Sequence, residues 1–314
     1  MRTLDDLGAL EGKRVLVRVD FNVPLEEGRI ADDSRIRAAL PTLDELRERG
    51  ARLVLVSHLG RPEDREPELS LRPAADRLAE LTGADVTLAP GVVGDEVEGL
   101  AANLHPGDVL MLENVRYEPG ETRNDPELAD ALARLGDAYV NDAFGAAHRA
   151  HASTEGVARR VPERAAGRLL QGEVETLGRL LADPERPLVA VLGGAKVTDK
   201  IGVIARFLDV ADAVLIGGAM AFPFLAAQGH AVGASKCDDE DVDPARRALE
   251  RAGRSECRLE LPRDLVIADR FAAEAQRREL QGVDVPDGWM GLDIGPRTAA
   301  AYAADVERAG TVFW

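Results

Sequence analysis

A chain of 314 residues is long for one hydrophobic core and fits two domains, since domains usually hold roughly 100–200 residues. Its composition, 45% hydrophobic and 30% charged, is that of a folded globular protein and excludes the disordered and fibrous classes. The formal charge of −17 excludes a broad electrostatic surface for nucleic acid or anionic membrane, so any anion site has to be local.

Short apolar runs rich in Val and Leu alternate with amphipathic segments along the chain. In chain order these runs are RVLVRVD, RLVLVSH, DVLMLEN, DAYVND, PLVAVLGG, DAVLIGGA and DLVIAD. This alternation predicts parallel β-sheets flanked by helices, which is an α/β fold.

Leucines at helical spacing between residues 167 and 182, followed by Asp183-Pro184, indicate a helix at a domain boundary. We therefore expect a first domain over residues 1–166, a linker helix over 167–183 and a second domain over 184–314. An ordinary crossover helix inside one large domain is the alternative.

Targeting and redox signals are weak. The N-terminal sequence MRTLDDLGALEGK lacks the apolar core of a signal peptide, and glycines and a proline interrupt the longest uncharged run, residues 213–227. Cys237 and Cys257 have no CxxC spacing, which favours reduced, structural cysteines. We expect a cytoplasmic protein with neither membrane nor nucleic-acid partners.

Polar residues follow the apolar runs of the first half of the chain, where ligands of parallel sheets bind. Together with one arginine in the segment after the first run, and two apolar neighbours, they are Asp20, Phe21, Asn22, Arg35, His58, Leu59, Gly60, Arg61, Arg116 and Arg149. Guanidinium groups hold phosphate or carboxylate with paired hydrogen bonds, so this set predicts a site for a multiply charged anion. Any one of these arginines alone is more typical of a solvated surface.

The histidines of the first half do not indicate a metal site. His58, His148 and His151 lack a third ligand at a metal-binding spacing, and no HExxH pattern is present. Hydrogen bonding to a substrate or to a domain hinge suits them better, and we expect no metal ligands in this chain.

In the second half, the segment LVAVLGGAKVTDKIGVIARFL predicts a buried strand, a Gly193-Gly194 turn and a helix beginning near Ala195. Lys196 and Lys200 would then share one face in the first turns, where the helix dipole disfavours cations. A phosphate between them explains this placement. The order GGAKVTDK is not the GxxxxGK[ST] of a P-loop, although the chemistry predicted is still phosphoryl transfer.

Two further glycine turns, around Gly217-Gly218 and around Gly291, would let a flat base approach the backbone. Glycine pairs after strands more often serve tight turns, so each is weak evidence alone.

Taken in order, VDFNVP, SHLGRP, LENVR, NDAFGAAHRAHAS, GGAKVTDKI, GGAMA and GWMGLDIGP resemble the phosphoglycerate kinase family over the whole chain. The resemblance implies two Rossmann-like domains around a cleft. It also implies a 3-phosphoglycerate site on the first domain, a nucleotide site on the second, and hinge closure between them.

Carried over by position, the ten residues after the first-half strands resemble the phosphoglycerate site, with Arg35 also stabilising the transferring phosphoryl group. Lys200 resembles a lysine that contacts nucleotide phosphates, and Lys196 the one beside the transferring group, so that Arg35, Lys196 and Lys200 are the catalytic candidates. The resemblance assigns Lys200, Gly217, Gly218, Gly291 and Leu292 to the nucleotide site. Ala219 stands where many members carry glycine.

The family continues beyond TVFW, so this resemblance implies an incomplete second domain and a protein ligand for Mg²⁺ in the absent segment. ATP or ADP would carry the Mg²⁺. We expect a monomeric kinase whose listed 314 residues alone are weakly active or inactive. The alternatives are a truncated, non-catalytic 3-phosphoglycerate-binding module and, less favoured, a different phosphotransferase.

Overall fold

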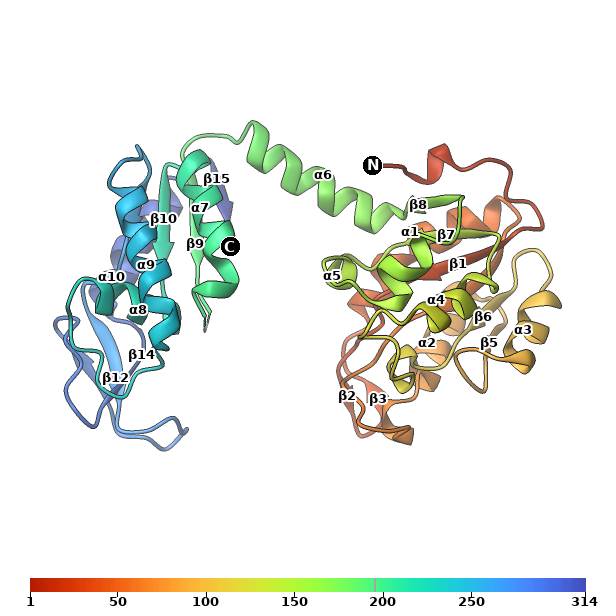
Figure 1. The fold of residues 1–314 in the computed structure, drawn as a ribbon, viewed down its shortest axis with the longest axis horizontal. Helices are drawn as coiled ribbons and strands as arrows, with labels where there is room; N and C mark the ends of the chain where they lie inside the picture. The colour runs from red at the N-terminus through yellow and green to blue at the C-terminus, as the bar shows by residue number, and fades with distance from the viewer. Residues whose placement is uncertain (195) are drawn as a thin grey trace. The chain divides into compact units, whose positions relative to one another are not determined.

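The computed structural model describes residues 1–194 and 196–314, and the chain divides into two compact units, Met1–Thr176 and Leu177–Trp314 (Figure 1). Each unit contains a parallel β-sheet with helices packed against it. Helix α6, Arg168–Ala182, runs across the point of division. The α/β fold class predicted from the apolar runs is confirmed.

The first unit is built on a six-stranded sheet in the order β5-β6-β4-β1-β7-β8, with every neighbouring pair parallel. Its strands are β1 (Arg14–Arg18), β4 (Arg52–Val56), β5 (Val86–Leu88), β6 (Val109–Met111), β7 (Ala138–Asn141) and β8 (Arg164–Ala166). A small antiparallel hairpin joins β2 (Leu25–Glu26) to β3 (Arg29–Ile30).

Helices cover both faces of this sheet (Figure 1). They are α1 (Ser34–Glu48), α2 (Arg72–Thr82), α3 (Asp95–Ala102), α4 (Pro126–Ala133) and the single turn α5 (Phe144–Ala147). Local sequence sets some of their ends: the Asp125 carboxylate accepts the N–H groups of Glu127 and Leu128 at the start of α4. Gly83 ends α2 in the left-handed conformation that favours glycine.

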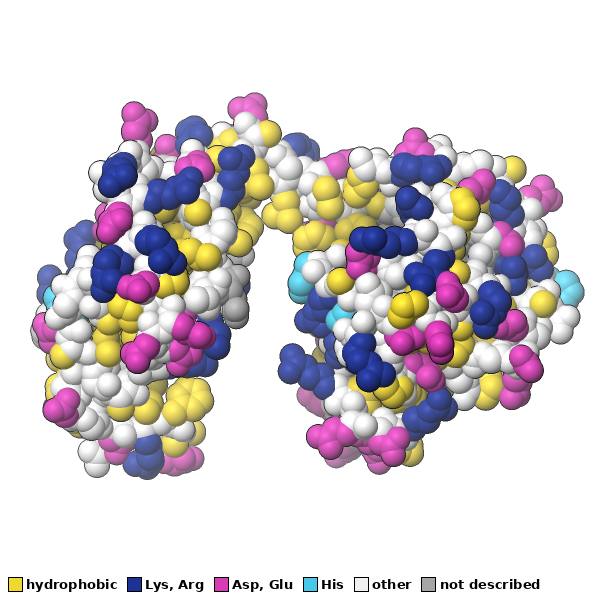
Figure 2. All heavy atoms as spheres, viewed as in Figure 1, with side chains coloured by type: hydrophobic (Ala, Val, Ile, Leu, Met, Phe, Trp, Pro, Cys, Tyr) yellow, Lys and Arg dark blue, Asp and Glu magenta, His cyan; other side chains and the backbone are white. Residues whose placement is uncertain are grey.

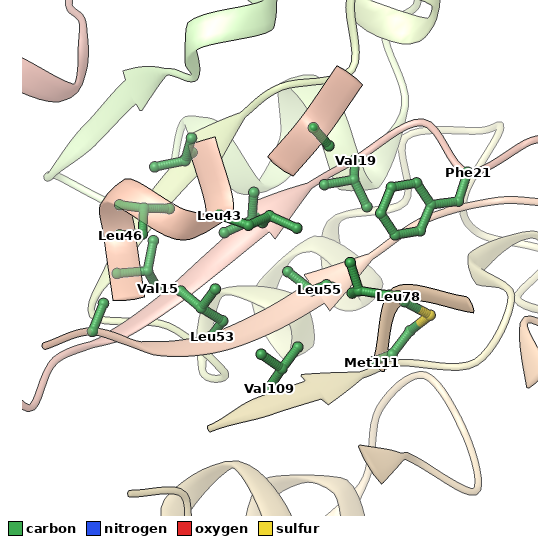
Figure 3. Packing of buried hydrophobic residues seen from close by; sticks show 14 of the residues in the cluster. Val15, Val19, Phe21, Leu43, Leu46, Leu53, Leu55, Leu78, Val109 and Met111 are labelled. Atoms are coloured by element: carbon green, nitrogen blue, oxygen red, sulfur yellow. The ribbon is translucent and has the colours of Figure 1, made fainter. Parts of the chain in front are cut away.

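Alternate residues of each strand enter different cores, because successive side chains of a strand point to opposite faces. Val15 and Leu53 pack with α1 and α2 in one core, part of which Figure 3 shows from close by. Leu16 and Val54 pack with α3 and α4 in the other. Burial on both faces is why these strands read as continuous apolar runs rather than as alternating ones.

The strand order positions the carboxyl ends of β1, β4, β6 and β7 at one edge of the sheet. From β1 the chain first moves outward through β4, and it later returns to β7 on the other side of β1. Ligands of open parallel sheets bind where the order reverses in this way.

The second unit has a four-stranded parallel sheet in the order β11-β10-β9-β15. Its strands are β9 (Leu188–Leu192), β10 (Ala213–Ile216), β11 (Arg258–Glu260) and β15 (Thr311–Phe313), the last being the TVFW run paired with β9. The helices of this unit are α7 (Ile201–Val210), α8 (Ala221–Ala227), α9 (Asp239–Ala252) and α10 (Pro296–Glu307).

A separate antiparallel sheet, β13-β12-β14, corrects one expectation for the second unit. The run DLVIAD forms β12 (Leu265–Ala268), but this strand pairs antiparallel with β13 (Arg277–Leu280) and β14 (Met290–Ile294). A short buried strand looks apolar in either kind of sheet, so the run alone did not determine its partners.

The molecular surface carries basic and acidic side chains intermixed over the visible face of each unit (Figure 2). Among the described residues, no helix combines the length and the apolar composition that crossing a bilayer requires.

Candidate functional site

One cavity of about 300 Å³ in the first unit gathers residues that follow four different strands of the sheet. We call this cavity the basic pocket, and its lining consists of Asp20, Asn22, Arg35, His58, Gly60, Arg61, Arg116, Gly145 and Arg149. Eight of these residues belong to the set that the sequence places after the strands. Four of them are arginines, which gives the pocket a strongly positive field inside an acidic protein.

The remaining two residues of that set, Phe21 and Leu59, do not line the basic pocket. Their side chains are buried in the hydrophobic core beside it. Their backbone N–H groups donate to Ser57 Oγ at 2.9 Å and to Asn114 Oδ1 at 3.2 Å. Both residues therefore support the loops that carry the pocket's polar side chains.

A carboxylate holds one of the arginines in place. Arg35 Nη1 at the start of α1 donates to Asp20 Oδ2 at 3.0 Å, and the Asp20 side chain is only 15% exposed. Asn22 Oδ1 accepts the Gly60 N–H at 2.8 Å, which ties the loop after β1 to the loop after β4. These contacts restrict Arg35 and the two loops before any ligand binds.

A buried amide organises the other side of the pocket. Asn114 is fully buried, and its Nδ2 donates to the carbonyls of Leu59 and Leu69 at 2.8 Å each. Its Oδ1 accepts the Arg116 N–H at 3.1 Å, and Arg116 Nη1 donates to the Gly60 carbonyl. Asn114 joins three loops in this way, a role that the motif LENVR did not reveal.

Gly145 is a lining residue that sequence reasoning missed. A Cβ at this position would lie 2.7 Å from Asp20 Oδ2, closer than side chains tolerate. Asp20 therefore occupies space that only a glycine leaves open. The available signal was the glycine in NDAFGAAH, soon after the end of β7.

The protonation of the basic pocket follows from burial and from the crowding of cations. Burial, with the charges of Arg18, Arg116, Arg149 and Arg35, lowers the pKa of His58 to about 2. Burial also lowers the pKa of Arg116, and the charge of Arg149 adds to that effect. His58 is therefore neutral at physiological pH, and the arginines repel each other in a way that an anion would relieve.

The other two histidines near this site lie outside the basic pocket. His148 Nε2 is 3.3 Å from Arg149 Nε, and His151 lines a neighbouring cavity of about 550 Å³ together with Arg61, Arg116 and Arg149. No group of three or more His, Cys, Asp or Glu side chains among the described residues is arranged to hold a metal ion.

In the second unit, two glycine turns meet beside a lysine. The turns follow β9 and β10, and Met220 N in the second donates to the Gly194 carbonyl in the first at 2.8 Å. Gly194 and Gly218 have φ angles of +142° and +62°, in the region that favours glycine. Lys200 Cε would lie 3.3 Å from a Cβ at Gly194, so the lysine lies directly against this turn.

The helix expected near Ala195 begins later, and Ala195 itself lies outside the described residues. A single 3-10 turn covers Thr198–Lys200, and α7 starts at Ile201 with Lys200 as its N-cap. Val197 is fully buried, and Asp241 Oδ1 accepts the Thr198 N–H at 2.8 Å. These two anchors hold the segment outside the helix, so the two lysines do not share the first turns of one.

Lys196 and Lys200 have different surroundings. Lys196 Nζ lies 3.5 Å from Glu240 Oε1 and 3.8 Å from Asp238 Oδ2, at the start of α9. Lys200 is exposed beside the glycine turns. The structure thus gives Lys196 acidic neighbours, where the sequence suggested a phosphate between the two lysines.

Gly291 and Leu292 lie on β14, which packs against the turn at Gly218–Met220. Asp293 Oδ1, next on the same strand, accepts the Gly218 N–H at 3.2 Å. A Cβ on Gly291 would lie 2.1 Å from Phe222 Cζ, so the buried ring of Phe222 fills the space over this glycine. The residues assigned to the nucleotide thus lie on segments that contact each other.

Comparison with known proteins adds sequence and fold evidence to this geometry. A family model described as phosphoglycerate kinase matches residues 4–314. A phosphoglycerate kinase of Moorella thermoacetica is 56% identical over 313 residues, which cover 99% of this chain and 79% of the relative. A cytosolic phosphoglycerate kinase of Nicotiana tabacum is 49% identical, over 97% of this chain and 76% of the relative.

Solved structures agree with the sequence comparisons. The phosphoglycerate kinase of Coxiella burnetii superposes with a TM-score of 0.77 at 40% identity, over 99% of this chain and 78% of that one. The enzyme of Pyrococcus horikoshii gives a TM-score of 0.78 at 30% identity, over 99% of this chain and 80% of that one. In both sequence and fold, the chain belongs to the phosphoglycerate kinase family.

Proposed function

We propose that the basic pocket binds 3-phosphoglycerate and that the glycine turns of the second unit bind the nucleotide. As a member of its family, the chain is a phosphotransferase with a carboxyl group as acceptor. The reaction is reversible phosphoryl transfer between ATP and 3-phosphoglycerate, which gives ADP and 1,3-bisphosphoglycerate in glycolysis.

The observation that carries the substrate assignment is the convergence of eight strand-end residues on one cavity. The substrate has a phosphate and a carboxylate, and four guanidinium groups can neutralise both with paired hydrogen bonds. Asn22 and neutral His58 add uncharged polar groups. The Phe21, Leu59 and Gly60 backbone completes the proposed substrate site.

Arg35, Lys196 and Lys200 are the proposed catalytic residues. Phosphoryl transfer requires mainly positioning and neutralisation of charge on the transferred group, which these cations supply without a covalent intermediate. Asp20 orients Arg35 for this role. Lys196 would exchange its contacts with Asp238 and Glu240 for phosphate oxygens.

For the nucleotide we propose Lys200, Gly217, Gly218, Gly291 and Leu292. Turns without Cβ atoms let a base or a phosphate approach the backbone closely, and Lys200 lies against one of them. Mg²⁺ would arrive on the phosphates, because this ion usually binds through one or two carboxylates plus substrate oxygens. Its chemistry is neutralisation of phosphate charge.

The proposed organisation assigns the substrate site to a domain of residues 1–166 and the nucleotide site to a domain of residues 184–314. Residues 167–183, which include α6, would be the helix that links them. We further propose a monomer that acts in the cytoplasm, as the name of the tobacco relative indicates for that protein.

Calorimetric titration with 3-phosphoglycerate tests the substrate assignment. Arg149→Gln is expected to weaken binding about tenfold or more, since hydrogen bonds to charged groups contribute about 1.5–3 kcal/mol each. Arg134→Gln is the matched control, because Arg134 pairs with Glu98 on the surface and does not line the basic pocket. Equal affinities of the Arg149 variant and the wild type would refute the assignment.

A further inference from the structure

A buried arginine lies behind the basic pocket, at the end of β1. Arg18 is only 1% exposed, although it is a charged residue in a strand that otherwise reads as apolar. It does not line the pocket. Burying a guanidinium is costly unless every donor finds a partner, so its contacts identify what it does.

Three neighbours accept hydrogen bonds from Arg18. Its Nε donates to Ser153 Oγ at 2.9 Å, and its Nη1 donates to the Val19 carbonyl. Its Nη2 lies 3.0 Å from Nδ1 of His58, which is a lining residue of the basic pocket. A guanidinium has five donors and no acceptor, so His58 Nδ1 must supply the lone pair in this contact.

A buried carboxylate fixes the orientation of this arginine from the far side. Ser153 donates to Glu121 twice, from its hydroxyl at 2.7 Å and from its backbone N–H at 2.9 Å. Burial acts to raise the pKa of Glu121, but hydrogen bonds from His151 and Ser153 and the charge of Arg18 outweigh it and leave that pKa below its ordinary value. Because an ionised carboxylate only accepts, the Ser153 hydroxyl proton faces Glu121 and the oxygen lone pair faces Arg18.

We propose that Arg18, oriented by Ser153 and Glu121, is a positioning residue that fixes His58 in the tautomer with its proton on Nε2 and so presents that N–H to the substrate. The proposal rests on the proposed function of the basic pocket. With Nδ1 occupied, Nε2 is the one ring nitrogen left to serve the pocket. The opposite tautomer would place two donors against each other in a buried site.

This arrangement gives the pocket a donor that carries no charge. Arg35, Arg116 and Arg149 already face His58 from other elements, and Arg18 adds a fourth cation. An imidazolium there would add to their repulsion, whereas a neutral imidazole donates one hydrogen bond to a substrate oxygen. The nearest acidic groups that oppose these cations are Glu121 behind Arg18 and Asp20 beside Arg35.

Nitrogen NMR of the histidine rings tests the proposal directly. The chain has five histidines, and His58→Gln identifies the His58 signal in a spectrum that correlates ring nitrogens with ring protons. We expect Nε2 protonated and Nδ1 unprotonated, with no titration between pH values of about 8 and 5, the range in which an ordinary histidine changes charge. An Nδ1–H tautomer, or titration in that range, would overturn the proposal.

Arg18→Met removes the donor and its charge, and Arg14→Met is the matched control on the same strand, where Arg14 pairs with Asp137 at the surface. In the Arg18 variant we expect an Nδ1–H population to appear and the affinity for 3-phosphoglycerate to fall about tenfold. The control is expected to keep the wild-type spectrum and affinity. An Arg18 variant that keeps both would also refute the proposal.

Addition of 3-phosphoglycerate to the wild type separates this proposal from the proposed function, and it does not depend on whether the Arg18 variant folds. We expect the His58 Nε2 signal to shift as the ligand binds. Calorimetric binding without that shift would contradict the role of His58 while leaving the pocket assignment intact. No calorimetric binding at all would contradict the pocket assignment, whereas the tautomer would still report on the Arg18 contact.

Discussion

The Asp142 carboxylate at the end of β7 accepts the backbone N–H of Leu169, in the first turn of α6, at 3.0 Å. The same oxygen accepts the Leu170 N–H at 3.2 Å, while the other carboxylate oxygen is buried with no hydrogen-bond partner. Asp142 thus satisfies N–H groups that a helix start leaves open. It also connects α6 to the strand that precedes the Arg149 loop of the basic pocket.

Asp142→Asn should change how the stability of the protein depends on pH. Burial raises the pKa of Asp142, so the folded state binds this proton more tightly than the unfolded state does. The cost of ionising Asp142 is absent below the ordinary carboxyl pKa of about 3.9 and appears as pH rises through the folded pKa. Asparagine cannot ionise, so the wild type should gain stability relative to the variant as the solution is acidified.

Urea unfolding of both proteins at neutral and at mildly acidic pH measures this difference. A wild-type minus variant difference in unfolding free energy that is constant, or that falls on acidification, would mean that Asp142 does not titrate as its burial implies.

Gly145→Ala should weaken 3-phosphoglycerate binding without unfolding the protein. The new Cβ would lie 2.7 Å from Asp20 Oδ2, so the carboxylate that holds Arg35 has to move. Gly172→Ala is the control, because a Cβ at that position in α6 meets nothing within 4 Å. We expect a several-fold rise in KM for 3-phosphoglycerate in the first variant alone, and equal KM values in all three proteins would show that the Asp20 position is unimportant.

Gly291→Ala should destabilise the second unit by about 1–3 kcal/mol, the usual cost of overpacking a core. Its Cβ would lie 2.1 Å from Phe222 Cζ, whereas a Cβ at the control position Gly282 meets nothing within 4 Å. Thermal unfolding measures the loss. Phe222→Leu should cost less in the Gly291→Ala background than alone, and strict additivity of the two changes would argue against this contact.

Lys200→Met should weaken binding of MgATP about tenfold or more, because a charge-assisted hydrogen bond to phosphate contributes about 1.5–3 kcal/mol. Affinity for 3-phosphoglycerate should stay at the wild-type value, since the basic pocket belongs to the first unit. Lys236→Met, at an exposed lysine of the same unit, is the control. Titration calorimetry with each ligand would expose a wrong assignment as an unchanged MgATP affinity or as a changed affinity for the acid.

Sequence reasoning worked where the fold enforces position. The carboxyl ends of parallel strands lie at one edge, so listing the residues after each apolar run brought together Asp20, His58, Arg116 and Arg149, which line one cavity. Gly145 escaped the list because a missing side chain gives no signal until its neighbour Asp20 is placed.

Buried polar residues were the harder class. Nothing in the letters RVLVRVD distinguishes a buried Arg18 from an exposed Arg14, because burial depends on Ser153 and Glu121, more than a hundred residues away along the chain. The helix expected near Ala195 was wrong for a similar reason, since Asp241 from α9 holds Thr198 outside the helix. Contacts distant in sequence decided both cases.

A crystal structure of this chain grown with 3-phosphoglycerate tests most directly whether the basic pocket is the substrate site. We predict density for the ligand inside the pocket, with its phosphate and carboxylate against Arg35, Arg61, Arg116 and Arg149 and one oxygen within hydrogen-bonding distance of His58 Nε2. Ligand bound elsewhere, for example in the arginine-lined cavity between α7 and α9 of the second unit, with the basic pocket empty, would contradict it.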